Sequence, residues 1–215
     1  DFINDHHAYS APLFYRGFPK SCCTSANHIV CHGVPSEKIL KDGDIINVDV
    51  TAFKSGWHGD TSRMFFVGET SVKAKKLVNA TYNSMIKGIE AINKDSTVGD
   101  IGFAIQSYVE KEGFSVVRDF CGHGIGETFH KSPNILHYGE KGSGVKLLPG
   151  MIFTVEPMIN EGSCDTKTLN DGWTAVTKDK KLSAQFEHTI GITKEGYEIF
   201  TSSEKRLNFP PYKND

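Results

Sequence analysis

Two ten-residue stretches decide how this chain is expected to fold: LKDGDIINVD at Leu40–Asp49 and LLPGMIFTVE at Leu147–Glu156. At an offset of 107 residues they share leucine, glycine, isoleucine and valine, and each ends in a carboxylate. Five agreements in ten positions indicate two related halves, and the period is too long for a solenoid. The alternative is two independent strands that each follow a glycine turn. We therefore predict a pseudo-symmetric fold in which each half delivers a carboxylate from a strand.

The first of these stretches leads into a predicted β-hairpin. Ile45–Thr51 is rich in β-branched residues and is expected to be a strand, and a second strand is expected over residues 60–67. Residues 54–59 are expected to form the loop between the two strands. Further strands are expected over 152–156, 184–192 and 197–201.

Two helices are predicted after the hairpin. In the first, apolar residues recur at helical spacing from Val78 to Ile89. The second begins at Thr97, where Thr97 and Asp100 have the spacing of a capping box, and it ends at Gly113.

Charge and hydropathy exclude two broad classes of function. The 215 residues contain 24 Lys and Arg against 26 Asp and Glu, a net charge of −2, which lacks the basic excess of a general nucleic-acid binder. No apolar run approaches the roughly 18 residues that a membrane helix needs. We expect neither a membrane-spanning segment nor sequence-specific nucleic-acid binding.

Cysteine usage and the first residues bear on location. The five cysteines are an odd number without a CxxC pair, which favours a reducing compartment over a disulfide framework. No signal peptide precedes the first motifs, so a cytoplasmic protein is expected. Because the chain begins at Asp1 rather than methionine, we expect a single catalytic domain over residues 1–215 that lacks an upstream N-terminal segment.

Four acidic residues lie in or beside segments that otherwise favour buried strands: Asp49, Asp60, Glu156 and Glu187. Burying one unpaired carboxylate costs several kcal/mol, and four buried together repel one another. Bound cations offset both costs. Each residue could instead lie at a solvated or salt-bridged strand end, but the set of four favours a metal site.

Histidine supplies the other type of ligand. The sequence CGHGIG at 121–126 places His123 among glycines, where the backbone can approach a ligand closely. One imidazole with four carboxylates suits Mn, Fe, Co or Zn and is typical of dinuclear hydrolytic sites. Two alternatives stay open. A zinc site could form from the Cys and His residues at 22–32, or Cys31 or Cys121 could act as a nucleophile beside a histidine.

Six short motifs together closely resemble those of type I methionine aminopeptidases, in the same order and with compatible spacing. They span nearly the whole chain, and the long helical insert of the type II enzymes is missing. The motifs are CHGVP at 31–35, NVDV at 47–50, HGDTS at 58–62, CGHGIG at 121–126, FTVEPM at 153–158 and QFEHT at 185–189.

The resemblance implies the α+β pita-bread fold, in which two pseudo-symmetric αβ halves place a curved antiparallel sheet around a dinuclear metal centre. It implies two divalent ions per chain (Co, Mn, Fe, Zn or Ni). Asp49 would chelate one ion, Asp60 and Glu187 would bridge both, and His123 and Glu156 would bind the other.

Catalytic and substrate-binding roles are implied in the same way. His32 would contact the scissile amide, His130 would contact its carbonyl oxygen, and Glu156 would shuttle a proton. A methionine pocket is implied from Tyr15, Phe18, Cys23, Phe120, Phe129 and Trp173. A monovalent cation is implied near Asn27, Ile29 and Ser183. Phe18 and Phe120 stand where relatives often have tyrosine, which removes hydroxyls from the pocket.

The implied activity is removal of the initiator methionine from nascent polypeptides when the second residue is small. A metal-bridging hydroxide would attack the first peptide bond. Nascent peptide N-termini at the ribosome are the expected partners, and the chain is expected to be a monomer. One rival is an aminopeptidase P-like enzyme that cuts before proline. The other is a non-enzymatic ribosome- or RNA-associated binding module.

Overall fold

The computed structural model describes residues 1–205 and 207–212. Its two long helices are α2 (Val72–Glu90) and α3 (Val98–Lys111), and α1 (Phe2–Asp5) is a single turn. Both predicted long helices are confirmed. The backbone N–H of Thr97 donates to Asp100 at 2.8 Å, and Gly113 follows α3 with a φ of 82°. In the part of the chain that the structure describes, no helix combines the length and apolar character needed to cross a membrane.

The predicted hairpin is present and longer than expected. Strand β4 (Ile45–Lys54) pairs with β5 (Trp57–Phe66) in antiparallel register up to the pair Lys54 and Trp57. The prediction of a loop over residues 54–59 is therefore wrong, because only Ser55 and Gly56 form the turn. Their φ angles of 51° and 89° suit a tight two-residue connection.

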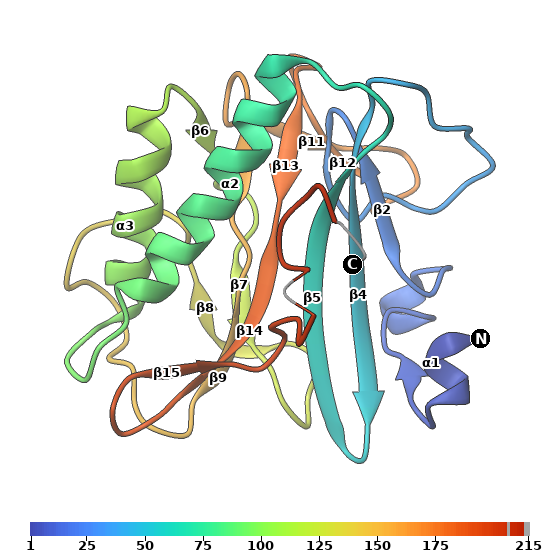
Figure 1. The fold of residues 1–215 in the computed structure, drawn as a ribbon. Coiled ribbons are helices and arrows are strands. Elements are labelled where there is room, and N and C mark those ends of the chain that lie inside the picture. The colour runs from blue at the N-terminus through green and yellow to red at the C-terminus, as the bar shows by residue number, and fades with distance from the viewer. Residues whose placement is uncertain (206, 213–215) are drawn as a thin grey trace.

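This hairpin lies in one half of an antiparallel sheet that has nine strands within the described residues. The main strand order is β1-β4-β5-β14-β9-β7-β8, so that β4-β5 on one side mirrors β9-β14 on the other (Figure 1). The further strands of this sheet are β1 (Tyr9–Ser10), β2 (Cys23–Ala26), β7 (Gly122–Gly124), β8 (Lys131–Ile135), β9 (Ile152–Val155), β14 (Glu187–Ile192) and β15 (Tyr197–Ile199).

Two small sheets flank the large one. The first has the order β13-β10-β6 and the second has the order β11-β12-β3. The prediction of one continuous strand over residues 184–192 is wrong, because the chain leaves β13 and enters β14 at Phe186, and the two strands belong to different sheets. The strands are β3 (Ile29–Cys31), β6 (Ser115–Val116), β10 (Met158–Asn160), β11 (Thr166–Thr168), β12 (Ala175–Thr177) and β13 (Ser183–Gln185).

One row of paired residues across the large sheet shows the relation between the halves. Val50 pairs with Thr61, Thr61 with His188, and His188 with Val155. Valine stands at both ends of this row, and Thr61 and His188 lie between. In this pairing Val50 corresponds to Val155. Their separation along the chain is two residues shorter than the offset between the two similar sequence stretches. A shift of two residues keeps every side chain on its own face, since strand side chains alternate with a period of two.

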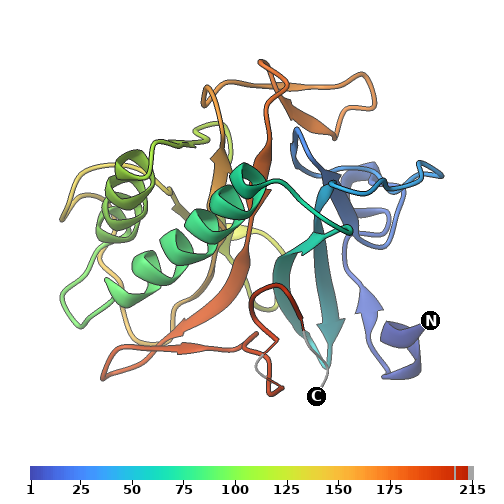
Figure 2. The ribbon, with the colours of Figure 1, turned by 45° about the horizontal axis from the view of Figure 1, so that its top comes forward.

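Helices α2 and α3 lie side by side and pack on one face of the large sheet (Figures 1 and 2). Their apolar faces join the strand residues Phe153 and Ile190 in one buried core. In β9 and β14 the alternate residues Thr154 and Thr189 point the other way. The strands therefore carry a dry face toward the helices and a polar face on which the functional side chains lie.

Glycine at position 122 is required by the close approach of β7 to β9. A Cβ added there would lie 2.3 Å from the carbonyl oxygen of Thr154, whereas one added at Gly59 in β5 would meet nothing within 4 Å. We expect Gly122→Ala to lower the free energy of unfolding by about 2 kcal/mol, because the strands must separate. Gly59→Ala is the matched control and should change it by less than about 0.5 kcal/mol. Urea denaturation of both variants measures this, and equal midpoints would contradict the prediction.

Candidate metal centre and substrate cavity

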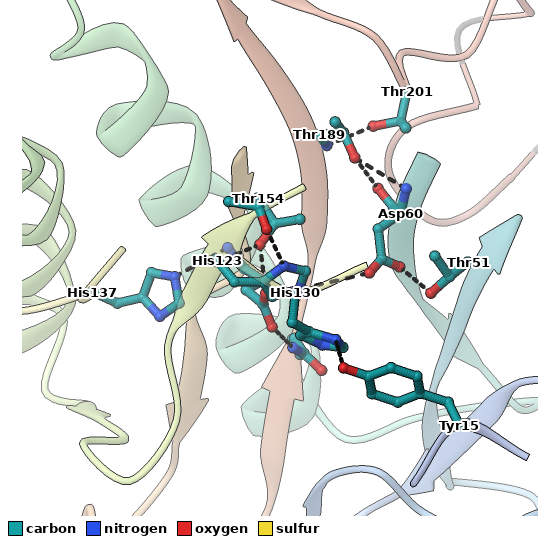
Figure 3. A network of polar contacts seen from close by, with 12 residues as sticks. Tyr15, Thr51, Asp60, His123, His130, His137, Thr154, Thr189 and Thr201 are labelled. Carbon is teal, nitrogen blue, oxygen red and sulfur yellow. Dashed lines mark hydrogen bonds and ion pairs between the residues drawn. The ribbon is translucent and has the colours of Figure 1, made fainter. Parts of the chain in front are cut away.

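Side chains from three strands meet at the centre of the sheet. Asp60 on β5, His123 on β7 and Glu187 on β14 each offer one ligand atom, and these atoms lie within 4.8 Å of one another. Nε2 of His123 is 3.8 Å from Asp60 Oδ2 and 3.6 Å from Oε1 of Glu156, which follows β9 (Figure 3). The structure thus brings together residues that are far apart in the sequence.

Strand register explains why the carboxylates meet. Asp49 on β4 pairs with Ser62, and Ser62 pairs with Glu187, so the three residues form one row across the sheet. Asp60 lies opposite Thr51, two rows along, and therefore on the same face of the sheet. Glu156 directly follows Val155 at the end of β9, beside this polar face.

Threonines from the same strands hold two of the acidic side chains. Thr51 donates to Oδ1 of Asp60 at 2.7 Å, and Thr154 donates to Oε1 of Glu156 at 2.6 Å. The hydroxyl of Thr189 accepts from the backbone N–H of Asp60 and donates to its carbonyl oxygen (Figure 3). Sequence reasoning missed these residues. Alternation could have found all three, since Thr51, Thr154 and Thr189 each lie two positions from a predicted ligand and so share its face.

Two further residues hold Glu156 through contacts that the sequence did not predict. Gln185 donates from Nε2 to Oε2 of Glu156 at 3.2 Å. His137 is fully buried, and its Nε2 accepts the backbone N–H of Glu156 at 3.1 Å. Its role in the structure is therefore to hold the backbone that carries Glu156.

The electrostatics of the cluster favour a bound cation. Burial raises the pKa values of Asp49 and Glu187 well above their usual range, and repulsion from neighbouring carboxylates raises them further. Burial also raises the pKa values of Asp60 and Glu156. A cation would favour the ionised forms and reverse these shifts. The donor set therefore fits a metal.

His123 is oriented as a metal ligand should be. Its Nδ1 lies 3.2 Å from the carbonyl oxygen of Gly124, which can only accept, so Nδ1 carries the hydrogen. Nε2 therefore presents a lone pair toward Asp60 and Glu156. Burial lowers the pKa of His123 to about 4, so the ring is neutral near pH 7. A hydrogen bond that sets the tautomer in this way is usual behind a ligating histidine.

A cavity of about 450 Å³ opens onto this cluster. All five predicted metal ligands and every predicted substrate-contacting residue line it. The substrate-contacting residues are Tyr15, Phe18, Cys23, His32, Phe120, Phe129, His130 and Trp173. Sequence reasoning did not assign Arg16, Cys31, Thr51, Asp119, Cys121, Lys131, Asn134 or Met158 to this wall.

Aromatic rings form the apolar part of the cavity. The edge of Phe18 meets Trp173 at a centroid distance of 5.2 Å, and His32 meets Phe120 edge-on at 5.5 Å. On another part of the wall Tyr15 packs against Phe129 at 4.8 Å. Such contacts hold the rings rigidly, which suits the recognition of an apolar side chain.

The three residues suggested for a monovalent cation lie outside this cavity. The carbonyl oxygen of Asn27 accepts the N–H of Ser183 at 2.8 Å, and Ile29 follows in β3. The side chain of Asn27 is engaged with Asp44 and with the N–H of Ile45. A cation at this position stays a prediction.

The alternative sites do not gain support. Among the residues that the structure describes, the one group of His, Cys and acidic side chains close enough to share an ion is that of Asp60, His123 and Glu187. The Cys and His residues at 22–32 are not part of it. Burial raises the pKa values of Cys31 and Cys121, which disfavours the thiolate that nucleophilic catalysis needs.

Comparison with known proteins places this geometry in a family. Residues 2–194 match the profile of Metallopeptidase family M24. The chain belongs to this family. It is therefore an enzyme of the hydrolase class that depends on metal, and the alternative of a non-enzymatic binding module is wrong.

Two relatives show how close the similarity to other M24 members is. The chain is 60% identical over 213 residues to the methionine aminopeptidase of Rickettsia prowazekii (strain Madrid E), covering 99% of this chain and 82% of that protein. The crystal structure of the Rickettsia prowazekii enzyme superposes with a TM-score of 0.92 over 93% of this chain and 81% of that chain. The crystal structure of methionine aminopeptidase from Thermotoga maritima, which is 42% identical, superposes with a TM-score of 0.91 over 94% of this chain and 81% of that chain. The pita-bread fold prediction is confirmed.

The carboxylate cluster predicts a pH-dependent response of this M24 enzyme to metal. Without metal, the folded-state pKa values lie above the value of about 4 in the unfolded chain. The folded state then binds more protons, so this contribution to stability is present below about pH 4 and is lost as pH rises. We expect Mn²⁺ added to chelator-treated protein to raise Tm more at about pH 7.5 than at about pH 5.5.

Calorimetry of the chelated and Mn²⁺-loaded protein at both pH values measures this. His123→Ala is the control, because loss of a ligand should reduce the increase in Tm at each pH. An equal increase in the unsubstituted protein at the two pH values would contradict the electrostatic account.

Proposed function

We propose that the chain is a methionine aminopeptidase, which removes the N-terminal methionine from polypeptides whose second residue is small. The observation that carries the proposal is one cavity in which a carboxylate–imidazole cluster and an aromatic slot share walls. The first can hold metal and the second suits an unbranched apolar side chain. The names of the similar proteins support the same activity.

Five residues are proposed to hold two divalent ions: Asp49, Asp60, His123, Glu156 and Glu187. When bound, such ions supply Lewis acidity that makes a water molecule nucleophilic near neutral pH. The protein supplies fixed positions for that chemistry, since all five side chains come from strands or directly follow one. The identity of the ions is open among Co, Mn, Fe, Zn and Ni.

Two histidines are proposed to bind the scissile amide. Burial lowers the pKa of His130 to about 3, so the ring is neutral and offers one N–H to the carbonyl oxygen of the substrate. A preorganised donor at a developing oxyanion contributes about 3 kcal/mol. His32, whose pKa burial also lowers, is held edge-on against Phe120 and Trp173 and contacts the amide region.

Glu156 is proposed to carry the proton. Thr154 and Gln185 each donate a hydrogen bond to one of its two carboxylate oxygens. The carboxylate accepts a proton from the attacking water and passes it to the nitrogen of the leaving amine. Its backbone is fixed by His137, so the proton travels between defined positions.

Selectivity for methionine is proposed to come from the slot formed by Tyr15, Phe18, Cys23, Phe120, Phe129 and Trp173. An apolar slot discriminates weakly, because one methylene is worth about 1–3 kcal/mol. Other unbranched side chains should therefore be removed slowly, and a β-branched residue should not fit.

The cellular setting forms part of the proposal. The substrates are nascent peptide N-termini at the ribosome, and the enzyme acts in the cytoplasm as a monomer with residues 1–215 as one catalytic domain. The charge balance of 24 basic and 26 acidic residues supports recognition of the peptide rather than of RNA. The monovalent cation near Asn27, Ile29 and Ser183 is proposed to have a structural role.

A panel of short peptides tests the proposed activity on Mn²⁺-loaded enzyme. Met-Ala-Ser should be cleaved, and Leu-Ala-Ser and Met-Leu-Ser should be cleaved at least about tenfold more slowly. Ala-Pro-Ser tests the aminopeptidase P-like rival and should not be cleaved. Nα-acetyl-Met-Ala-Ser tests the need for a free amine. Preferential cleavage of Ala-Pro-Ser would replace the proposed function with its rival.

Asp60 is the side chain whose charge the proposed site needs most. It pairs with Thr51 in the sheet and is only 4% exposed. Asp60→Asn keeps the shape and removes the charge, so we expect kcat/KM for Met-Ala-Ser to fall by at least about 1,000-fold, a loss of about 4 kcal/mol. Metal content per chain should fall as well.

The matched control is Asp95→Asn, which removes the charge of an exposed aspartate that pairs with Lys146. It should leave kcat/KM within about twofold of the unsubstituted enzyme, since exposed ion pairs contribute little. Full turnover by Asp60→Asn would refute the assignment of this residue.

A further inference from the structure

Tyr15 and His130 make a contact that a methionine slot alone does not require. The hydroxyl of Tyr15 lies 3.0 Å from Nδ1 of His130 (Figure 3). The two rings also stack, with centroids 5.1 Å apart and planes inclined by 27°. Within the described part of the chain, this is the only side-chain hydrogen bond that either group makes.

The backbone around Tyr15 is shaped to present this side chain. Phe14 and Arg16, on either side of it, have φ angles of 64° and 48°, in the left-handed region that residues other than glycine rarely adopt. The N–H of Phe14 donates to the carbonyl oxygen of Phe18 at 2.8 Å and closes the turn. Phe14 itself is 77% exposed, whereas Tyr15 lines the cavity.

The hydrogen bond determines which nitrogen of His130 carries the hydrogen. A neutral imidazole has one N–H and one acceptor nitrogen, so the partner of one nitrogen decides which of the two carries the hydrogen. A phenol donates better than it accepts because the ring withdraws electron density from its oxygen. With Tyr15 as donor, Nδ1 accepts and the hydrogen lies on Nε2. The opposite tautomer would leave Nε2 as an acceptor, which repels a carbonyl oxygen.

We propose that Tyr15 is a positioning residue: its hydroxyl donates to Nδ1 of His130 and holds that ring as the Nε2–H tautomer, ready to donate to the substrate carbonyl oxygen. The inference rests on the proposed function, in which His130 is that donor. Phe18 and Phe120 line the same cavity without a hydroxyl. An apolar wall needs only the ring, so the hydroxyl of Tyr15 has a separate role.

Tyr15→Phe isolates the hydroxyl, because the ring contacts with His130 and Phe129 are kept. We expect kcat for Met-Ala-Ser on Mn²⁺-loaded enzyme to fall about five- to tenfold, with KM changed by less than about twofold. An unchanged kcat would show that Tyr15 is only a wall of the slot and would overturn the inference. The control is Tyr108→Phe on α3, which removes another hydrogen-bonded phenol, 3.3 Å from Asn83 and outside the cavity. It should leave kcat unchanged.

A double-mutant cycle separates this inference from the proposed function. His130→Ala should lower kcat about 100-fold. In that background, adding Tyr15→Phe should cost less than about 1.5-fold if the hydroxyl acts through the ring. A second full loss would mean that Tyr15 acts independently. If His130→Ala alone retained normal kcat, the donor role in the proposed function would fail instead.

The tautomer can also be read without substrate. ¹⁵N NMR of histidine-labelled, zinc-loaded enzyme should show His130 as the Nε2–H tautomer, and Tyr15→Phe should shift its nitrogens toward a mixture of the two tautomers. A merely structural role for Tyr15 would not move this signal. An Nδ1–H tautomer in the unsubstituted enzyme would overturn the inference whatever the activity.

Discussion

Repulsion among four carboxyl groups at the centre of the sheet is the constraint on which the rest of the structure depends. Burial raises the pKa values of Asp49, Asp60, Glu156 and Glu187, and repulsion from neighbouring carboxylates raises those of Asp49, Glu156 and Glu187 further. Such a cluster opposes folding unless something else stabilises the strands that carry it. That stabilisation comes from the dry face, where the helices bury Phe153, Ile190 and their neighbours.

The same strands thus carry the stabilising core on the face toward the helices and the carboxylate cluster on the opposite face. Threonines hold the carboxylate face rigid. Thr51 and Thr154 donate hydrogen bonds to carboxylates that repel one another, and these bonds keep the carboxylates from turning apart. A cation then meets ligands that are already oriented. Little side-chain entropy remains to be lost on binding, which favours both affinity and a single geometry.

Local sequence signals predicted the elements that local interactions determine. The capping box at Thr97 and the repeated strand-forming stretches depend on neighbouring residues, so both helices and the hairpin could be predicted. The position of the hairpin turn could not be predicted, because His58 and Gly59 have little strand propensity and separate Trp57 from the rest of the strand. They extend β5 because they pair with β4 and because His58 donates to the distant carbonyl of Gly126 at 2.8 Å.

The residues of the candidate site also fall into those that the sequence could predict and those that it could not. Carboxylates in apolar strands are conspicuous, so Asp49, Asp60, Glu156 and Glu187 could be singled out from the sequence. The contacts of His137 and Gln185 could not, because their partner Glu156 is distant in the chain and nothing local to either residue points to it. The break at Phe186 was missed for a related reason: no proline or turn residue near it marks the point where the chain changes sheets.

The proposed metal centre and the proposed selectivity slot lie on different kinds of backbone. The proposed ligands lie on or beside paired strands, whereas Tyr15, Phe129 and Trp173 lie on connecting segments between strands. Loops tolerate substitution better than a sheet whose register sets the ligand positions. Substrate preference can therefore change through the slot without disturbing the chemistry. Tyr15 is the exception, since its hydroxyl links the slot to His130 and couples the two.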